Sequence, residues 1–410
     1  MTWGLRPVKI VPVSLSFAQN IGLARSALLK SNPAYVQFYI TARCNLACEQ
    51  CNIIYADAAA AELSLDQIEQ VAENLAAIGV CIVLLIGGEP FVRHDLPEII
   101  AAFTRRGIHV RMQTNGLASR SMLERCIAAG GHDISISLDS LVPATQDVIN
   151  GGFHKSWDRA IDTVAMINEL FPANGTAFFG TVLMPRNVVE LPDVVEFATE
   201  IGWGVSLVPV HTSTPDQPRG FRAFDDASVV TFAPDSYPQV ARVLAYLKRM
   251  HQQGFLLYDS DEYLDDTYRF VTGQPVHWRR RNHDVCDWPN LYFAIAPNGN
   301  IKACVDFELD QAFPTYHPDF PAWYRDGRIH REVARFTRPC DGCMYGSYPE
   351  ITVSLRYLKP AFERFLYFNV STPRLKRLSA GAMKELAADI YRRGASRRAS
   401  LKDGGSVDAL

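Results

Sequence analysis

Short apolar runs alternate with amphipathic stretches along the first half of the chain. Six runs between residues 34 and 210 are rich in β-branched and aromatic side chains, as strands are. In the stretches between them, apolar residues recur every three or four positions, which is the period of a helix. The expected strands are 34–41, 80–86, 108–114, 132–138, 176–184 and 203–210. The expected helices are 64–78, 95–106, 119–129, 156–169 and 188–201. This alternation predicts an α/β fold with a parallel sheet.

Residues at the ends of these helices support the same assignment. Ser64 and Ser156 stand at helix starts, where a hydroxyl caps free N–H groups. Glycine readily adopts the positive φ that ends a helix, and four predicted helices are followed by one: Gly79, Gly107, Gly130 and Gly202.

Polar motifs come directly after the first four predicted strands. A cysteine-rich segment follows the first strand, and GGEP (87–90), TNG (114–116) and DS (139–140) follow the next three. An open doubly wound sheet and a barrel both fit the periodicity, and both bind ligands at the carboxyl ends of their strands. We therefore expect the active site at this edge of the sheet.

Outside the core at 34–210, the chain divides into four further regions. These are an N-terminal extension (1–33), a connecting region (211–285), a small cysteine-bearing domain (286–345) and a C-terminal helical segment (346–410). A helix is expected over 14–29, packed on the core, and another near 237–253. The last fifteen or so residues, SRRASLKDGGSVDAL, have the composition of a disordered tail.

Composition narrows the class of protein. The 410 residues are 48% hydrophobic and 21% charged, with a net charge of −3, as in a globular protein with no general attraction for nucleic acid. No apolar run approaches the length of a membrane span, and the N-terminus lacks the pattern of a signal peptide. We therefore expect a cytoplasmic protein without membrane contact.

Seven of the nine cysteines fall into two groups. The segment TARCNLACEQCNI (41–53) spaces three of them as C-x3-C-x2-C: Cys44, Cys48 and Cys51. Four come late in the chain: Cys286, Cys304, Cys340 and Cys343. In a reducing compartment such clusters favour metal sites over disulfides. The other two, Cys81 and Cys126, lie in apolar periodic segments and are expected in the core. Three thiolates hold a metal cluster with one position open, where an outside ligand can bind.

The first cysteine group and the motifs after it resemble those of the radical S-adenosylmethionine (SAM) enzymes. The matching segments are CNLACEQC (44–51), GGEP (87–90), TNG (114–116) and SISLDSL (135–141), and the likeness is greatest to the branch of the molybdenum-cofactor cyclases and SPASM/Twitch enzymes. The resemblance implies a partial (β/α)6 barrel in which the three cysteines hold a [4Fe–4S] cluster. SAM binds its open iron and is cleaved reductively to a 5′-deoxyadenosyl radical that takes a hydrogen atom from the substrate.

The resemblance also assigns cofactor-binding residues. It implies SAM contacts for Gly87, Gly88, Glu89, Pro90, Asn115 and Ser137. The glycines leave a strand edge free of side chains, so that the SAM amino group can approach. Gln50 stands where the family commonly has an aromatic residue, and this departure puts adenine packing in doubt but not cluster binding.

The late cysteines resemble a Twitch domain. The segment 291–307 reads as a β-hairpin around PNGN, which would return Cys304 toward Cys286, and Cys340 and Cys343 follow as C-x2-C. By resemblance these four cysteines hold an auxiliary [4Fe–4S] cluster, whose natural role without an open iron is electron transfer. Structural zinc is the alternative. Asp306 is a candidate base for a substrate hydroxyl, and WRRR (278–281) a candidate anion site.

These features predict a radical SAM oxidoreductase acting on a small molecule such as a sugar, a cyclitol or another secondary metabolite. A flavodoxin or ferredoxin would supply the electron. Two other enzymatic alternatives are modification of a ribosomal peptide and carbon–carbon bond formation or rearrangement. A non-catalytic iron–sulfur electron carrier is the alternative from another class.

Overall fold

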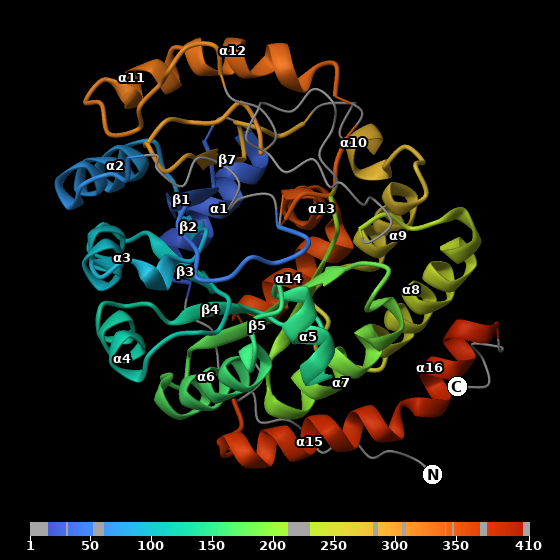
Figure 1. Ribbon diagram of the computed structural model, residues 1–410. Helices are drawn as coiled ribbons and strands as arrows, with labels where there is room; N and C mark the ends of the chain where they lie inside the picture. The colour runs from blue at the N-terminus through green and yellow to red at the C-terminus, as the bar shows by residue number, and fades with distance from the viewer. Residues whose placement is uncertain are drawn as a thin grey trace.

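The computed structural model describes residues 15–29, 32–51, 61–211, 230–281, 286–305, 309–340, 342–346, 348–369 and 375–404. Within them, parallel strands form one curved sheet in the order β6-β5-β4-β3-β2-β1-β7, a partial barrel with helices around its outside (Figure 1). The strands are β1 (Tyr35–Thr41), β2 (Ile82–Gly87), β3 (His109–Thr114), β4 (Asp133–Ser137), β5 (Thr176–Leu183), β6 (Gly204–Pro209) and β7 (Tyr292–Ile295). The α/β partial barrel predicted from the sequence is confirmed.

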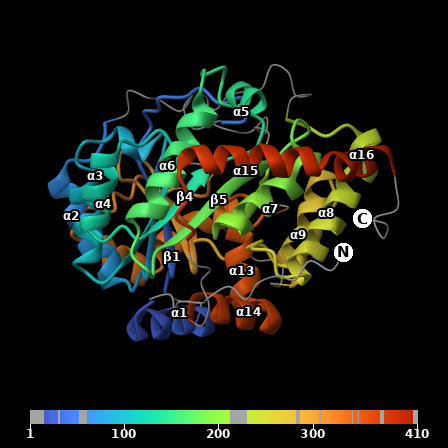
Figure 2. The ribbon, with the colours of Figure 1, turned by 90° about the horizontal axis from the view of Figure 1, so that it is seen from below.

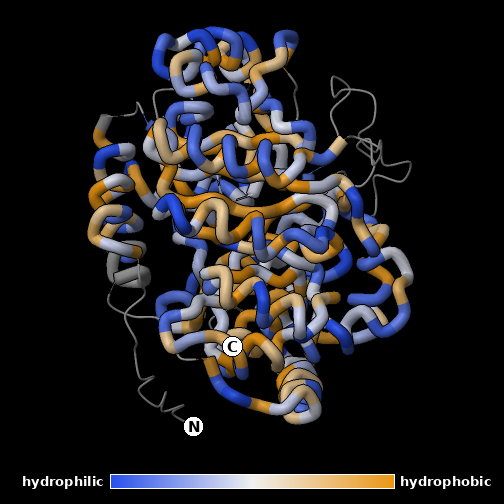
Figure 3. The backbone as a smooth tube through the Cα atoms, turned by 90° about the vertical axis from the view of Figure 1, so that its left-hand side faces the viewer, coloured by the Kyte–Doolittle hydropathy of each residue, from blue (hydrophilic) through white to orange (hydrophobic). Residues whose placement is uncertain are grey.

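The outer layer is formed by the helices that connect successive strands. These are α2 (Leu65–Ala77), α3 (Leu96–Thr104), α4 (Arg120–Ala128), α6 (Ser156–Leu170) and α7 (Leu191–Ile201), with the short α5 (Pro143–Ile149) before α6. The expected helices are confirmed to within a few residues, whereas α5 was not expected. Apolar stretches gather along the strands in the middle of the molecule (Figure 3), and the side chains between sheet and helices are fully buried, among them Phe38, Phe103 and Phe179.

Further helices surround the barrel. They are α1 (Phe17–Leu29), α8 (Tyr237–Gln252), α9 (Asp261–Val271), α10 (His277–Arg281), α11 (Phe320–Arg325), α12 (Arg328–Thr337), α13 (Tyr348–Arg356), α14 (Leu358–Asn369), α15 (Ala380–Arg393) and α16 (Ala395–Asp403). Figure 2 shows α1 and α14 at the end of the molecule opposite α5. As expected, α1 packs on the core: a Cβ on Gly22 would lie 2.6 Å from Cys81 Sγ. Cys81 and Cys126 are both buried, as expected. No helix in the described ranges combines the length and the apolar character needed to cross a membrane.

One predicted cap is correct and one is wrong. Ser64 forms a capping box with Gln67 at the start of α2. Ser156 is instead the first residue of α6, because Lys155 is the N-cap with φ of 62°. The Asp147 carboxylate accepts hydrogen bonds from the backbone N–H groups of Lys155 and Trp157, at 2.8 and 3.2 Å, and thereby caps the helix from outside it.

The hairpin expected over 291–307 is only partly formed. β7 joins the barrel sheet in parallel to β1, with Tyr292 opposite Tyr35, so the sheet gains a strand that was not expected. After the turn at Gly299, which has φ of 85°, Ile301 forms one antiparallel bridge with Ile295. Every residue of β7 is buried, although β7 lies at one end of the sheet. The segment leading to Cys304 is therefore attached to the barrel itself.

The expectation of a disordered tail is wrong for residues 396–404. They belong largely to α16, where Leu401 is buried and Arg397 and Arg398 both contact the carboxylate of Asp193 on α7. Arg397 also donates to Glu196 Oε2 at 2.9 Å. The charged composition suggested disorder, but these charges have buried partners on the barrel. Residues 405–410 lie outside the described ranges.

Replacing Asp193 by asparagine is expected to lower the free energy of unfolding by about 3–5 kcal/mol, because it removes the buried carboxylate that pairs with both Arg397 and Arg398, although Arg397 keeps Glu196. Asp193 is 0% exposed, and urea unfolding followed by circular dichroism measures the change. Asp389→Asn is the matched control, since Asp389 pairs with Arg392 and Arg393 at the surface. Equal stability of the two variants would contradict a structural role for this ion pair.

Candidate active site

The cysteine motif forms a loop directly after β1, at the carboxyl edge of the sheet. Cys44, Cys48 and Cys51 are partly exposed and line one cavity of about 250 Å³, which we name the cluster-loop cavity. Burial raises the pKa of Cys48 above its usual range, and the neighbouring Cys51 and Asp139 raise it further. Thiols in such surroundings become ligands when a metal displaces their protons.

The two glycines of GGEP let the end of β2 approach this loop. Gly88 N donates to Thr41 O, and Glu89 N donates to Arg43 O, both at 2.8 Å. A Cβ on Gly87 would lie 2.1 Å from Thr41 O, and one on Gly88 would lie 2.2 Å from Arg43 O. Both glycines line the cluster-loop cavity, as expected, but the space that a side chain would need is filled by the loop backbone. Their first role is therefore to seat the loop that carries the cysteines.

Glu89 holds the neighbouring turns together rather than pointing at open space. Its Oε1 accepts hydrogen bonds from Phe91 N and Thr114 Oγ1, both at 2.9 Å, and its Oε2 accepts one from Asn115 N at 2.6 Å. The side chain is 2% exposed, and burial raises its pKa to about 7. Pro90 begins the short turn that follows. Glu89 thus links GGEP to TNG, and the SAM contact expected of it would have to use the same two oxygens.

Replacing Glu89 by glutamine is expected to cost about 1–3 kcal/mol of unfolding free energy, because an amide N–H₂ would then face a backbone N–H. Chemical denaturation of the variant measures this loss. The half-exposed Glu124, changed to glutamine, controls for charge and should shift stability by under about 0.5 kcal/mol. A Glu89→Gln protein as stable as this control would show that the bonds to Thr114 and Asn115 do not hold the site.

Asn115 contacts the cysteine loop itself. Its Nδ2 donates to Asn45 Oδ1 at 2.7 Å and lies 3.9 Å from Cys44 Sγ, within hydrogen-bond distance of sulfur. The expected proximity of TNG to the cysteines is therefore present. A donor at the sulfur of a cluster ligand is one way in which a protein tunes a cluster.

Gln50 and the end of β4 meet on the other side of the loop. Gln50 Nε2 donates to Asp139 Oδ2 at 3.3 Å, and Val182 N donates to Asp139 Oδ1 at 2.7 Å. Burial raises the pKa of Asp139 to about 7. Ser137 lines the cluster-loop cavity, and its contact with SAM stays a prediction. Because Gln50 is held by Asp139, its amide forms part of the wall in the place of the aromatic ring usual in the family.

Two residues at this site were not identified from the sequence. Asn150 lines the cavity, and its Oδ1 lies 3.6 Å from Cys48 Sγ. His211 follows β6, stacks on Tyr345 with ring centroids 3.8 Å apart, and accepts a hydrogen bond at Nε2 from Met344 N. Burial lowers the pKa of His211 to about 3, so its ring is neutral. His211 thereby joins the barrel edge to the segment of Cys343.

Cys286, Cys304 and Cys340 lie near enough to Cys343, beside the barrel, to act on its charge. Burial raises the pKa of Cys343 well above its usual range, and Cys286, Cys340 and Cys304 act on it in the same direction. Trp278 Nε1 donates to Cys343 O at 3.0 Å, and Arg279 Nη2 donates to Thr337 O at 2.9 Å. The anion site suggested for WRRR is therefore corrected for these two residues, which support the cysteine segment. Asp306 lies outside the described residues.

The two cysteine groups fit iron–sulfur clusters by the chemistry of their donors. Three thiols around a cavity leave one cluster position for another ligand, whereas four thiols complete a site. No three His, Cys, Asp or Glu side chains of the described ranges lie close enough to share a single metal ion. When bound, a [4Fe–4S] cluster with SAM supplies reductive cleavage to a 5′-deoxyadenosyl radical; the chain's own part is to hold the thiolates and to shape the cavity beside them.

The sequence of this chain is similar to those of known proteins. Residues 38–198 match the Radical SAM superfamily. The AdoMet-dependent heme synthase of Methanosarcina barkeri is 33% identical over 172 residues, 42% of this chain, so the chain spans about half (48%) of that relative's length. The PqqA peptide cyclase of Rhodopseudomonas palustris is 32% identical over 346 residues, which are 80% of this chain and 82% of the relative.

Solved structures share the fold. SuiB of Streptococcus suis has a TM-score of 0.57 at 18% identity, covering 78% of this chain and 74% of that chain. The enzyme anSMEcpe, solved with bound AdoMet and a peptide, has a TM-score of 0.53 at 10% identity, covering 92% of this chain and 100% of that chain. Motifs, fold and relatives agree: the chain belongs to the radical SAM superfamily, in its SPASM/Twitch branch, and its cofactors are SAM and [4Fe–4S] clusters.

Proposed function

We propose that this radical SAM enzyme acts on a peptide. The observation that carries the proposal is the relative from Rhodopseudomonas palustris, which aligns along most of both chains and is named a PqqA peptide cyclase. A structure of SuiB with the precursor peptide SuiA lends further support, since the two proteins share a fold. We therefore favour the alternative of peptide modification over the oxidation of a small molecule.

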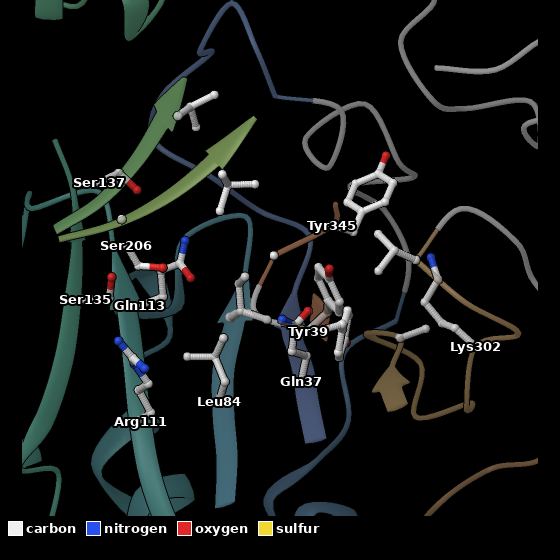
Figure 4. A pocket seen from close by; sticks show the side chains of 18 of the residues that line it. Gln37, Tyr39, Leu84, Arg111, Gln113, Ser135, Ser137, Ser206, Lys302 and Tyr345 are labelled. Carbon is white, nitrogen blue, oxygen red and sulfur yellow. The ribbon is translucent and has the colours of Figure 1, made fainter. Parts of the chain in front are cut away.

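The site has room for a side chain of such a substrate. Beside the cluster-loop cavity lies a second cavity of about 300 Å³, which we name the barrel cavity (Figure 4). It extends from the inner face of the sheet to Lys302 and Val305, near Cys304, and to Tyr345 and Gly346, near Cys343. A side chain in it would lie between the two groups of cysteines.

We propose cyclisation by a new bond between two side chains as the reaction. Loss of one hydrogen atom to the 5′-deoxyadenosyl radical, followed by bond formation and loss of one electron and one proton, removes two hydrogens from the peptide. The auxiliary cluster is a suitable acceptor for the electron, and Asp306 remains our candidate for the proton. A flavodoxin or ferredoxin is our proposed donor for the electron that cleaves SAM.

Co-expression with candidate precursor peptides encoded beside the gene tests this function. The expected result is a peptide lighter by two hydrogens. The mass of the peptide should not change when the Cys48→Ala variant is co-expressed in place of the wild-type enzyme. Cys81→Ala is the matched control, because Cys81 is a core residue away from both cysteine groups. SAM cleavage with no modified peptide, and conversion of a small alcohol instead, would return the function to small-molecule oxidation.

A further inference from the structure

The barrel cavity borders the cluster-loop cavity. The two share the side chains Ile86, Gln113, Ser137, Val182, Val208 and Tyr345 in their walls. A group bound in the barrel cavity is therefore adjacent to the place where the three cysteines meet.

Several polar side chains stand among the apolar ones in the wall of the barrel cavity. Branched apolar residues normally fill such an interior. Here the inward positions of β1, β3 and β4 include Gln37, Arg111, Gln113 and Ser135 (Figure 4). Polar side chains on the wall of a cavity can pair with polar atoms of a ligand, so these positions favour a polar ligand.

Arg111 is held in a defined orientation at one side of this cavity. Its Nε lies 3.6 Å from Asp133 Oδ1, and its guanidinium carbon lies 4.4 Å from the centroid of the Phe178 ring. Asp133 is also held by His109, whose Nε2 lies 3.0 Å from Asp133 Oδ2. The planar guanidinium thus has a carboxylate near its Nε edge and an aromatic ring against one face. Such a preorganised fork suits a carboxylate, which it binds through two parallel hydrogen bonds.

The charge of the cavity wall has one sign. Among the described residues that line it, the charged side chains are Arg111 and Lys302, and none is acidic. Lys302 is 9% exposed, and its Nζ lies 6.0 Å from the centroid of the Tyr39 ring. Asp133, behind the wall, offsets part of the charge of Arg111, and in a cavity of low dielectric constant the remaining positive charge attracts an anion more strongly than it would in water.

We propose that the barrel cavity binds a carboxylate of the substrate through Arg111, with Gln113 and Ser135 as further donors. This deepens the proposed function and rests on it in one respect: the carboxylate would be an acidic side chain of the peptide. A chain-terminal carboxylate or a free dicarboxylic acid has the same chemistry, so the test separates the three sources.

Calorimetric titration of the anaerobically reconstituted protein with SAM tests the proposal without turnover. The probes are a blocked alanine pentapeptide with a central glutamate, an alanine tripeptide with a free carboxyl end, and glutarate. Each is compared with its uncharged amide. We expect the glutamate peptide to bind at least about 10-fold more tightly than the glutamine peptide, as for a charged hydrogen bond.

Two variants assign the preference to one residue. Arg111→Gln should remove the preference for the acid, whereas Arg105→Gln should keep it, because Arg105 pairs with Glu69 on the outer surface. If any of the three acids binds in a way that depends on Arg111, the carboxylate site is supported. The acid that binds most tightly then identifies the source of the carboxylate. If glutarate alone binds in this way, the site stands while a peptide substrate is disfavoured. If wild-type protein binds acids and amides equally, or the preference survives in Arg111→Gln, the proposal is overturned.

Discussion

Replacing Cys48 by alanine is expected to abolish SAM cleavage. Cys48 is one of three thiols around the cluster-loop cavity, and two remaining thiolates do not hold a [4Fe–4S] cluster with SAM at its open position. Chromatography of 5′-deoxyadenosine after reduction with dithionite measures the loss. Iron content should fall from about eight to about four atoms per chain, because the auxiliary group remains.

Two matched variants locate this effect. Cys81→Ala should retain both the iron and the cleavage activity, since Cys81 packs against α1. A double change of Cys304 and Cys343 should also remove about four irons, but from the auxiliary group. Full iron and normal 5′-deoxyadenosine production in Cys48→Ala would show that this motif does not hold the catalytic cluster.

Replacing Gly88 by alanine is expected to lower the rate of SAM cleavage at least about 100-fold, the effect that a displacement of about 1 Å has on a reacting centre. The new Cβ would lie 2.2 Å from Arg43 O, so the backbone immediately before Cys44 must move. The rate of 5′-deoxyadenosine formation measures the effect, and the electron paramagnetic resonance spectrum of the reduced cluster reports whether its surroundings change.

Gly381→Ala is the matched control for this change. Gly381 lies in the first turn of α15, and a Cβ there would meet nothing nearer than Ser379 Oγ at 3.9 Å. This variant should cleave SAM at the wild-type rate. A Gly88→Ala enzyme as active as the control would mean that close packing of GGEP on the cysteine loop is unnecessary for catalysis.

The strands, the main helices and the cysteine loop were predictable because their signals are local. Apolar residues recur every two positions along a half-buried strand and every 3.6 positions along a helix, so neighbouring residues are enough to identify each element. The first cysteine motif is likewise a single run of eight residues. The position of Arg111 was predictable in the same way. In HVRMQT (109–114), polar residues alternate with Val110 and Met112, so one face of β3 is polar.

The remaining features depend on tertiary contacts. Asn150 and His211 reach the cluster-loop cavity from segments far from the cysteines, and no local spacing identifies them. β7 reads as a hairpin strand until its pairing with β1 is known. Likewise, α16 is stable because Asp193, some two hundred residues earlier, binds its arginines.

Deuterium transfer from a labelled peptide into 5′-deoxyadenosine tests most directly whether this enzyme takes a hydrogen atom from a peptide. With a precursor peptide deuterated at its side chains, we predict deuterium in the 5′-deoxyadenosine together with a peptide that has lost two hydrogens. Unlabelled 5′-deoxyadenosine from every candidate peptide, with deuterium arriving instead from a labelled sugar or cyclitol, would contradict the account.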